Sequence, residues 1–206
     1  MPLADLLTLC SHCFQGIHRY RVSDAVISTA ITNFPLNTEP SNVLTKVVLI
    51  NSLYRTQIYD VIGIAEHILT VNFDERLQQG DIGLVGAIRL GHGIGNRDLY
   101  SFATKYANWH RPTLFPIYDR LVKRILPRLN NRFHFSDPFT QADLHEYPVL
   151  VSTIDSLLTF CDLDVLNYKQ LDQGLWLYAK FVYEREHDPL PEGIVQQIQN
   201  VENTMD

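Results

Sequence analysis

The chain has 206 residues, of which 46% are hydrophobic and 19% are charged, so its composition is that of an ordinary globular protein with room for a buried core. No apolar run approaches the roughly 18 residues that a membrane span needs, and no basic region precedes the first apolar residues as in a secretory signal. The formal net charge of −6 argues against a surface that binds nucleic acid throughout. We therefore expect a soluble, cytoplasmic protein without a membrane partner.

Apolar residues recur at helical spacing through the first third of the chain. Ser23 and Asp24 can begin a second helix, and Ser41 is a plausible N-cap for an unusually apolar helix that we expect at the buried centre of the fold. The expected elements are a helix over residues 3–17, a helix from residue 23, a loop over 35–40, and helices over 43–55 and 59–71.

Helical patterns continue to the C-terminal end, broken by loops at prolines and turn residues. Asn72, Asp81 and Asp164 are expected to cap three of the helices, and Pro148 suits only a first helical turn. The helices are expected over residues 72–79, 81–90, from 96 or 98, over 119–126, 144–163 and 165–184, with loops over 109–116 and 130–138.

No sustained alternation typical of a strand is present, so we predict an all-α fold. The expected arrangement is a helical bundle of two intertwined lobes within a single helical unit over residues 1–206. Residues 187–206 are polar and contain two prolines, which predicts a flexible, loosely attached tail.

The three cysteines do not suggest a disulfide framework or a metal site. Cys10 and Cys13 form a C-x-x-C, but they lie in an apolar helical repeat and no second pair follows, so a zinc site would be incomplete. We interpret them as buried small hydrophobic residues. The histidines show no ligand spacing with an acidic partner, and we expect no metal and no cofactor.

The stretch over residues 87–128 combines a glycine turn with a run of positive charge. Gly91, Gly93 and Gly95 permit a tight turn whose backbone amides can lie bare to an anion. Between Arg89 and Arg132 the chain carries nine basic and two acidic residues, a net +7, whereas the remainder carries −13. A positive face on an acidic body would place phosphate contacts beside the turn; the alternative is an ordinary solvated helix face.

The turn and the residues after it resemble the helix-hairpin-helix DNA glycosylases, the HhH-GPD superfamily, and the FPIYDRLVKR run is most similar to its adenine-excising members. The stretch SFATKY followed by PIYD also resembles a group of uncharacterised bacterial proteins. The resemblance implies a helix-hairpin-helix and catalytic-aspartate segment over residues 86–128, at the junction of the lobes. It is carried by Gly93, Ile94, Gly95, Phe115, Pro116, Ile117, Asp119, Val122, Lys123 and Arg124.

The resemblance implies that Asp119 is the catalytic carboxylate. A carboxylate at a helix start can stabilise the positive charge that develops on the sugar as a base leaves, and can orient water. The alternative is that Asp119 only caps its helix. Contacts with DNA are implied for the turn and the basic residues near it, namely Gly91, Gly93, Gly95, Arg97, Arg120, Lys123 and Arg124.

Two features of the resembled family are missing from this chain. Its bifunctional members use a lysine that corresponds in position to Arg97, and arginine stays protonated and cannot act as an amine nucleophile. Lys105 is the nearest lysine that could take the role, although a solvated or phosphate-binding lysine is the competing interpretation. Many members also carry a four-cysteine iron–sulfur cluster, which Cys161 alone cannot build.

Polar and aromatic residues suggest a pocket for an extruded base. Asn51 and Tyr54 interrupt an apolar helix, and Trp109 and Tyr118 flank the aspartate in sequence. The alternatives are a helix that simply reaches solvent at its end, and core packing of the aromatic residues. The first hypothesis is a bacterial base-excision-repair glycosylase that binds duplex DNA, monofunctional rather than a lyase. The second is an inactive DNA-binding or protein-interaction module of the same fold.

Overall fold

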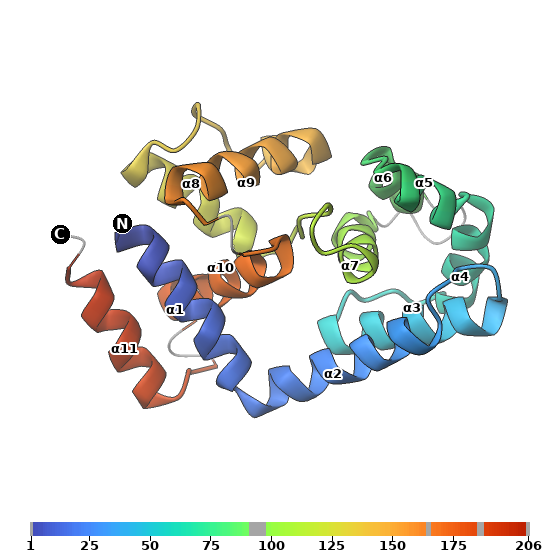
Figure 1. Cartoon of the computed structure of the whole chain (residues 1–206), viewed down its shortest axis with the longest axis horizontal. Helices are drawn as coiled ribbons and strands as arrows, with labels where there is room; N and C mark the ends of the chain where they lie inside the picture. The colour runs from blue at the N-terminus through green and yellow to red at the C-terminus, as the bar shows by residue number, and fades with distance from the viewer. Residues whose placement is uncertain (1, 91–97, 164–165, 185–187, 205–206) are drawn as a thin grey trace. The chain divides into compact units, whose positions relative to one another are not determined.

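The structure is a computed structural model that describes residues 2–90, 98–163, 166–184 and 188–204. In these residues all regular structure is helical, with eleven α-helices and one 3₁₀ helix (Figure 1). The prediction of an all-α protein is therefore confirmed. The chain divides into two compact units, of which unit 1 combines residues 1–21 with 118–206 and unit 2 spans 22–117.

Unit 1 is built from both ends of the chain. In it α1 lies along α10, and α11 also packs against α1 (Figure 1). The buried positions of α1 include Leu3, Leu6, Leu7 and Cys10, whose spacing gives one apolar stripe along the helix. The helices of this unit are α1 (Pro2–Gly16), α8 (Val122–Phe133), η1 (Asp143–His145), α9 (Tyr147–Cys161), α10 (Tyr168–Tyr183) and α11 (Glu192–Glu202).

A glycine allows the close approach of α1 and α10. A Cβ atom built on Gly174 would lie 2.5 Å from the Leu7 carbonyl oxygen, nearer than nonbonded atoms can pack. Any larger residue would therefore push the two helices apart. The N-terminus of α10 is fixed by a capping box, in which Asn167 accepts from the Gln170 amide and the Gln170 side chain accepts from the Asn167 amide.

Part of the segment expected to be a flexible tail is folded. Its prolines precede α11 rather than interrupt it, because Pro191 is the N-cap residue of that helix. Ile198 is fully buried, and the Tyr178 hydroxyl of α10 donates a hydrogen bond of 2.6 Å to Glu202. The polar composition of this segment concealed an amphipathic helix.

Unit 2 packs its helices around α7. Helix α3 contacts α4 and α7, and α6 contacts α7. Every residue of α7 from Phe102 to Trp109 is buried, whereas α3 buries one face and leaves Val48 and Leu53 exposed. The expectation that the apolar 43–55 helix is the buried centre is therefore wrong, and α7 has that place. The helices are α3 (Pro40–Tyr54), α4 (Val61–Thr70), α5 (Phe73–Gln79), α6 (Gly83–Arg89) and α7 (Tyr100–His110), together with most of α2 (His18–Asn33).

Several helix ends differ from those expected. Helix α2 begins at His18, before Ser23, and α3 begins at Pro40 with Glu39 rather than Ser41 at the N-cap position. A proline fits the first turn because that turn does not use its N–H groups within the helix. Pro148 lies in the first turn of α9, as predicted. Residue 164 lies outside the described residues, and the cap of α10 is Asn167.

The helix after Asp119 is longer than expected and starts later. It was predicted over residues 119–126, but α8 runs from Val122 to Phe133 with Pro127 inside it. A proline removes one helical hydrogen bond, but Leu126 and Leu129 on its two sides are buried, and their burial favours continuing the helix. The predicted loop over residues 130–138 therefore begins only at His134.

Candidate functional site

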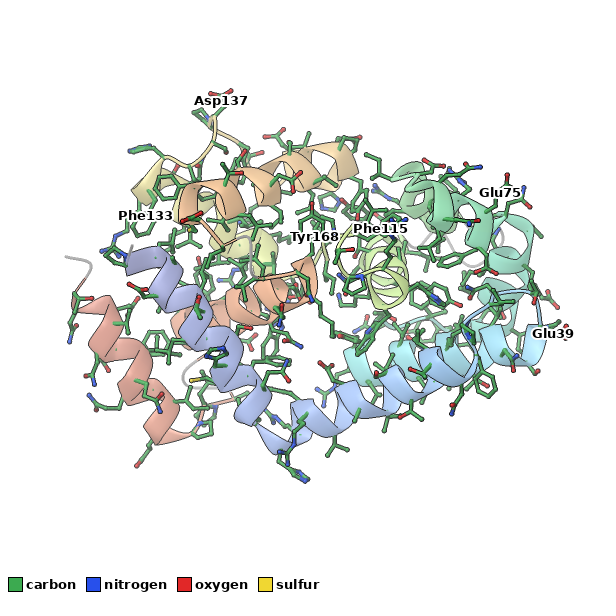
Figure 2. The ribbon with its side chains drawn as sticks, viewed as in Figure 1. Glu39, Glu75, Phe115, Phe133, Asp137 and Tyr168 are labelled. Atoms are coloured by element: carbon green, nitrogen blue, oxygen red, sulfur yellow. The ribbon has the colours of Figure 1, made fainter. Side chains whose placement is uncertain are left out.

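The chain reaches Asp119 through a segment that is held tightly within unit 2. Phe115 is fully buried, with its side chain turned inward, while Glu39 and Glu75 project from the surface (Figure 2). The Asn108 amide donates a hydrogen bond of 2.7 Å to the Phe115 carbonyl. Arg111 donates one of 2.8 Å to the Leu77 carbonyl. These bonds fix the backbone immediately before the predicted site.

Asp119 lies at the entrance to α8, as the sequence predicted. One of its carboxylate oxygens accepts a hydrogen bond of 2.8 Å from the Leu121 amide, and its carbonyl accepts one of 2.9 Å from the Lys123 amide. The first bond is an Asx turn, which holds the carboxylate in one orientation. The bond lies one residue before α8, whose N-cap residue is Leu121 and has no side-chain cap bond, so Asp119 does not cap the helix itself. The residue as a whole is half-buried.

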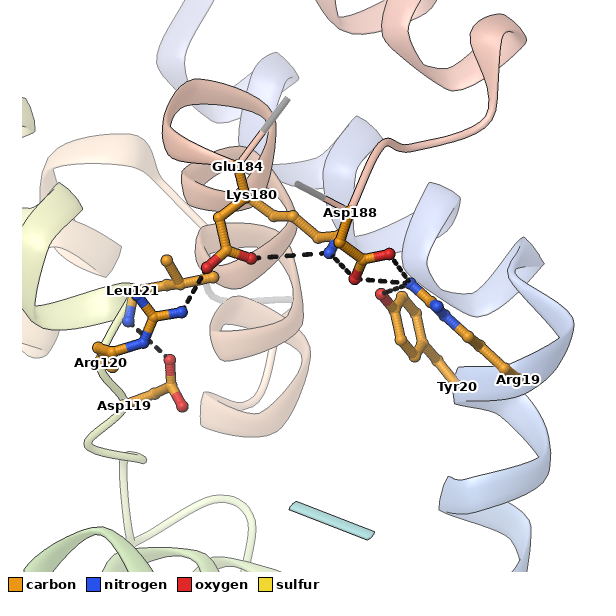
Figure 3. A network of polar contacts seen from close by, with 8 residues as sticks. All are labelled: Arg19, Tyr20, Asp119, Arg120, Leu121, Lys180, Glu184 and Asp188. Carbon is orange, nitrogen blue, oxygen red and sulfur yellow. Dashed lines mark hydrogen bonds and ion pairs between the residues drawn. The ribbon is translucent and has the colours of Figure 1, made fainter. Parts of the chain in front are cut away.

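The next residue, Arg120, starts a chain of charged groups in unit 1 (Figure 3). Its guanidinium forms an ion pair with Glu184, the residue that follows α10. The second Glu184 oxygen lies 3.7 Å from the ammonium group of Lys180, one turn earlier. The Lys180 side chain is buried and forms a second ion pair with Asp188.

The chain of charges continues to the first helices. Arg19 lies 3.2 Å from Asp188, and its guanidinium donates a hydrogen bond of 2.7 Å to the Tyr20 hydroxyl (Figure 3). The hydrogen bond from Lys180 lowers the pKa of Asp188 below its usual value, and Arg19 adds to this shift. The roles of Lys180, Glu184 and Asp188 in this network were not predicted from the sequence. The only signal was the four-residue spacing of a lysine and an acid on a helix.

Two basic residues of α8 lie beside aromatic rings. Tyr118 is buried and shares a hydrogen bond of 2.6 Å with the His145 Nε2 atom, and the Lys123 ammonium lies 5.8 Å from the Tyr118 ring centre. Arg124 stacks 4.1 Å from the ring centre of Tyr183. Tyr118 is therefore held by packing and a hydrogen bond within unit 1.

The nine basic residues counted in the sequence do not share one unit. Arg89, Lys105 and Arg111 belong to unit 2, Arg97 lies outside the described residues, and the other five belong to unit 1 on or beside α8. Arg89 forms an ion pair of 2.7 Å with Asp98, and Arg111 binds carbonyl groups. Four of the basic residues counted in unit 1 lie on α8, namely Lys123, Arg124, Arg128 and Arg132.

Unit 2 contains three of the residues predicted for the base pocket. The Asn51 side chain accepts hydrogen bonds from Thr56 and the Ile58 amide and donates one to the Ile58 carbonyl, each of 2.9 Å. These bonds shape the loop after α3 and account for a polar residue there without a ligand. Trp109 is buried in α7, which agrees with the core-packing alternative.

Tyr54 and Lys105 lie together, a pairing that the sequence did not indicate. The Lys105 ammonium is 5.6 Å from the Tyr54 ring centre and donates a hydrogen bond of 2.7 Å to the Ser101 hydroxyl. Lys105 is only 2% exposed, so it is not the solvated lysine of the alternative interpretation. The predicted turn residues Gly91, Gly93, Gly95 and Arg97 lie outside the described residues.

The described cysteines and histidines do not form a metal centre. In the part of the chain that the structure describes, no group of three metal-binding side chains is gathered. Burial raises the pKa of the Cys10 thiol strongly and that of Cys161 to about 11, which favours the neutral thiol. Across the same residues, no helix has the length and apolar character that crossing a bilayer requires.

Comparison with known proteins places the chain in a family. The model of a family named HI_0787_N, described as an N-terminal domain, matches residues 7–114, just over half of the chain. The chain belongs to the HI_0787_N family. The HI_0787_N match begins within α1 and covers nearly all of unit 2, and it ends before Asp119 and α8.

One relative extends beyond that match. An uncharacterised protein of Haemophilus influenzae (strain ATCC 51907 / DSM 11121 / KW20 / Rd) is 37% identical over 147 residues, which is 69% of each chain. No solved structure matches significantly.

Proposed function

We propose that this protein binds duplex DNA through α8 and hydrolyses the N-glycosidic bond of a damaged, modified or mismatched base, with Asp119 as the catalytic carboxylate. The observation that carries the proposal is the carboxylate of Asp119, held by a backbone hydrogen bond at the entrance to a helix with four basic side chains. Cationic side chains beside such a carboxylate suit a polymer of phosphates, because they neutralise charge without reading sequence.

The reaction needs a flipped nucleotide and a negative charge beside its sugar. As the bond between C1′ and the base nitrogen breaks, its electron pair leaves with the base, and the Asp119 carboxylate stabilises the positive charge on the sugar. A water oxygen then bonds to C1′ and gives its proton to the carboxylate. The products are a free base, which takes up a proton, and an abasic site.

Hydrolysis is favoured over a lyase reaction. Arg97 cannot act as an amine nucleophile. Lys105 has an amine, but that amine is buried and bonded to Ser101. We therefore expect that any base excision leaves an intact abasic strand, and that borohydride traps no covalent complex.

A binding measurement tests the DNA contact. The probe is a duplex carrying a stable abasic-site analogue, titrated at two salt concentrations with wild type and with Arg128→Ala. We expect the exposed Arg128 to contribute a phosphate contact, so its loss should weaken binding about threefold or more at low salt and reduce the salt slope by about one. Arg21→Ala, which removes the same charge from an exposed position on α2, is the matched control.

Activity is tested on duplexes with a panel of modified and mismatched bases. Wild type should release one of these bases, and Asp119→Asn should bind the abasic duplex with nearly unchanged affinity but release none. Absence of binding by wild type at low salt would overturn the DNA proposal.

A second candidate is a DNA-binding or protein-interaction module that has lost its chemistry. The Asx turn of Asp119 and the packing of Tyr118 on His145 favour it, because both residues have structural roles without a substrate. This candidate predicts that wild type and Asp119→Asn bind equally and that neither releases a base. If neither binds DNA, a protein partner is the remaining form of this candidate.

A further inference from the structure

Glu184 lies beside a basic residue that is expected to contact DNA. Its carboxylate pairs with Arg120, directly after Asp119 in the chain (Figure 3). The two partners differ in exposure, since the Arg120 side chain is 63% exposed and that of Glu184 only 19%. The arginine is therefore the partner that can turn outward, while the glutamate stays against the protein.

Glu184 keeps a partner when Arg120 leaves it. Its other oxygen lies 3.7 Å from the Lys180 ammonium, which is buried and also paired with Asp188. Removing one partner of a charge pair is costly when the other charge is left unpaired. Here Lys180 remains beside the carboxylate, so the release of Arg120 leaves no isolated charge.

We propose that Glu184 is a built-in competitor for the DNA backbone, which holds Arg120 in the free protein and yields it to a phosphate when DNA binds. The proposal rests on the proposed function of α8. The competition sets the affinity of the site, because each binding event must first break the pair between Arg120 and Glu184. An ion pair whose arginine is mostly exposed suits this role, since exposed charge pairs open at small cost.

The test is DNA affinity in three variants, measured with the same abasic duplex at low salt. Glu184→Gln keeps the shape of the side chain and removes the competing charge, so binding should tighten about threefold to fivefold. Asp188→Asn removes the same charge from the same network without touching Arg120, so it should change affinity less than about twofold. Adding Arg120→Ala to Glu184→Gln should abolish the gain.

Each outcome decides a separate point. If wild type binds but Glu184→Gln binds no tighter than Asp188→Asn, the competition is refuted and DNA binding stands. If neither wild type nor Glu184→Gln binds at low salt, both the competition and the DNA function are overturned. Thermal unfolding of each variant establishes that it is folded.

Discussion

The two units handle a buried lysine in different ways. In unit 1, Lys180 is neutralised by two carboxylates that are in turn paired with the arginines Arg120 and Arg19. In unit 2, Lys46 is fully buried, and its ammonium donates hydrogen bonds of 2.9 Å to the carbonyls of Phe34 and Leu36. Lys180 thus belongs to a network of ion pairs, whereas Lys46 joins two carbonyls of one loop.

Other polar groups near Lys46 also have fixed hydrogen-bond partners. Asp74 accepts hydrogen bonds of 2.7 and 2.8 Å from the backbone and side-chain amides of Asn37, and the Tyr106 hydroxyl donates one of 2.6 Å to the Asn37 side chain. Burial lowers the pKa of Lys46 to about 8, and the nearby Asp74 opposes that shift. Unit 2 therefore uses its buried polar groups for a fixed connection between the 34–39 loop and α5 and α7. Where the partners of a charged side chain are fixed, we expect that side chain to have a structural role. Where a charged side chain is exposed, we expect that it can exchange its partner for a ligand.

The largest effect should come from removing each lysine at nearly constant volume. Lys46→Met leaves two carbonyls without a donor, so the free energy of unfolding should fall by about 2 kcal/mol. Lys180→Met leaves Glu184 with Arg120 and Asp188 with Arg19, so the loss should be below about 1 kcal/mol. Denaturant titration of both variants measures the difference. A larger loss of unfolding free energy for Lys180→Met than for Lys46→Met would contradict this difference between the two units.

The two units should also differ in how their stability depends on pH. Burial lowers the pKa of His110 in unit 2 from 6.5 to about 3, so its ring is neutral in the folded protein. The unfolded chain then binds more protons, and stability should fall as the pH drops from about 6.5 towards 3. Asp188 in unit 1 has a lowered pKa, so its contribution is present above 3.8 and is lost only at lower pH.

Measuring the melting temperature as a function of pH tests both pH ranges. His110→Phe keeps a ring against Phe73 and Tyr106 and removes the titrating group, so the slope between pH 6.5 and 4 should flatten. His12→Phe, the same change at an exposed position, is the matched control. An equal slope in wild type and His110→Phe would refute the role of His110.

Local patterns predicted the elements but not the contacts among distant residues. Helical spacing gave α1 and α4 nearly to the residue, and the placement of Asp119 at the entrance to α8 followed from the motif. The continuation of α8 through Pro127 could not be predicted, because it depends on burial of Leu129 by tertiary packing. The charge network was hidden for the same reason, since Arg120 and Glu184 lie 64 residues apart. The DNA contacts and the chemistry of Asp119 stay predictions.

The smallest effect should be the loss of Arg120 itself. Its side chain is mostly exposed, and exposed ion pairs contribute little, so Arg120→Ala should lower the free energy of unfolding by less than about 0.5 kcal/mol. Glu184 retains Lys180, so no buried charge is left alone. If Arg120→Ala instead cost as much as Lys46→Met, the arginine would be a structural member of unit 1, unable to serve as an exchangeable contact. A stable Arg120→Ala protein that binds DNA weakly would show that Arg120 serves binding and not folding. A variant of Lys46 cannot make this distinction, because the loss of Lys46 is expected to destabilise the fold.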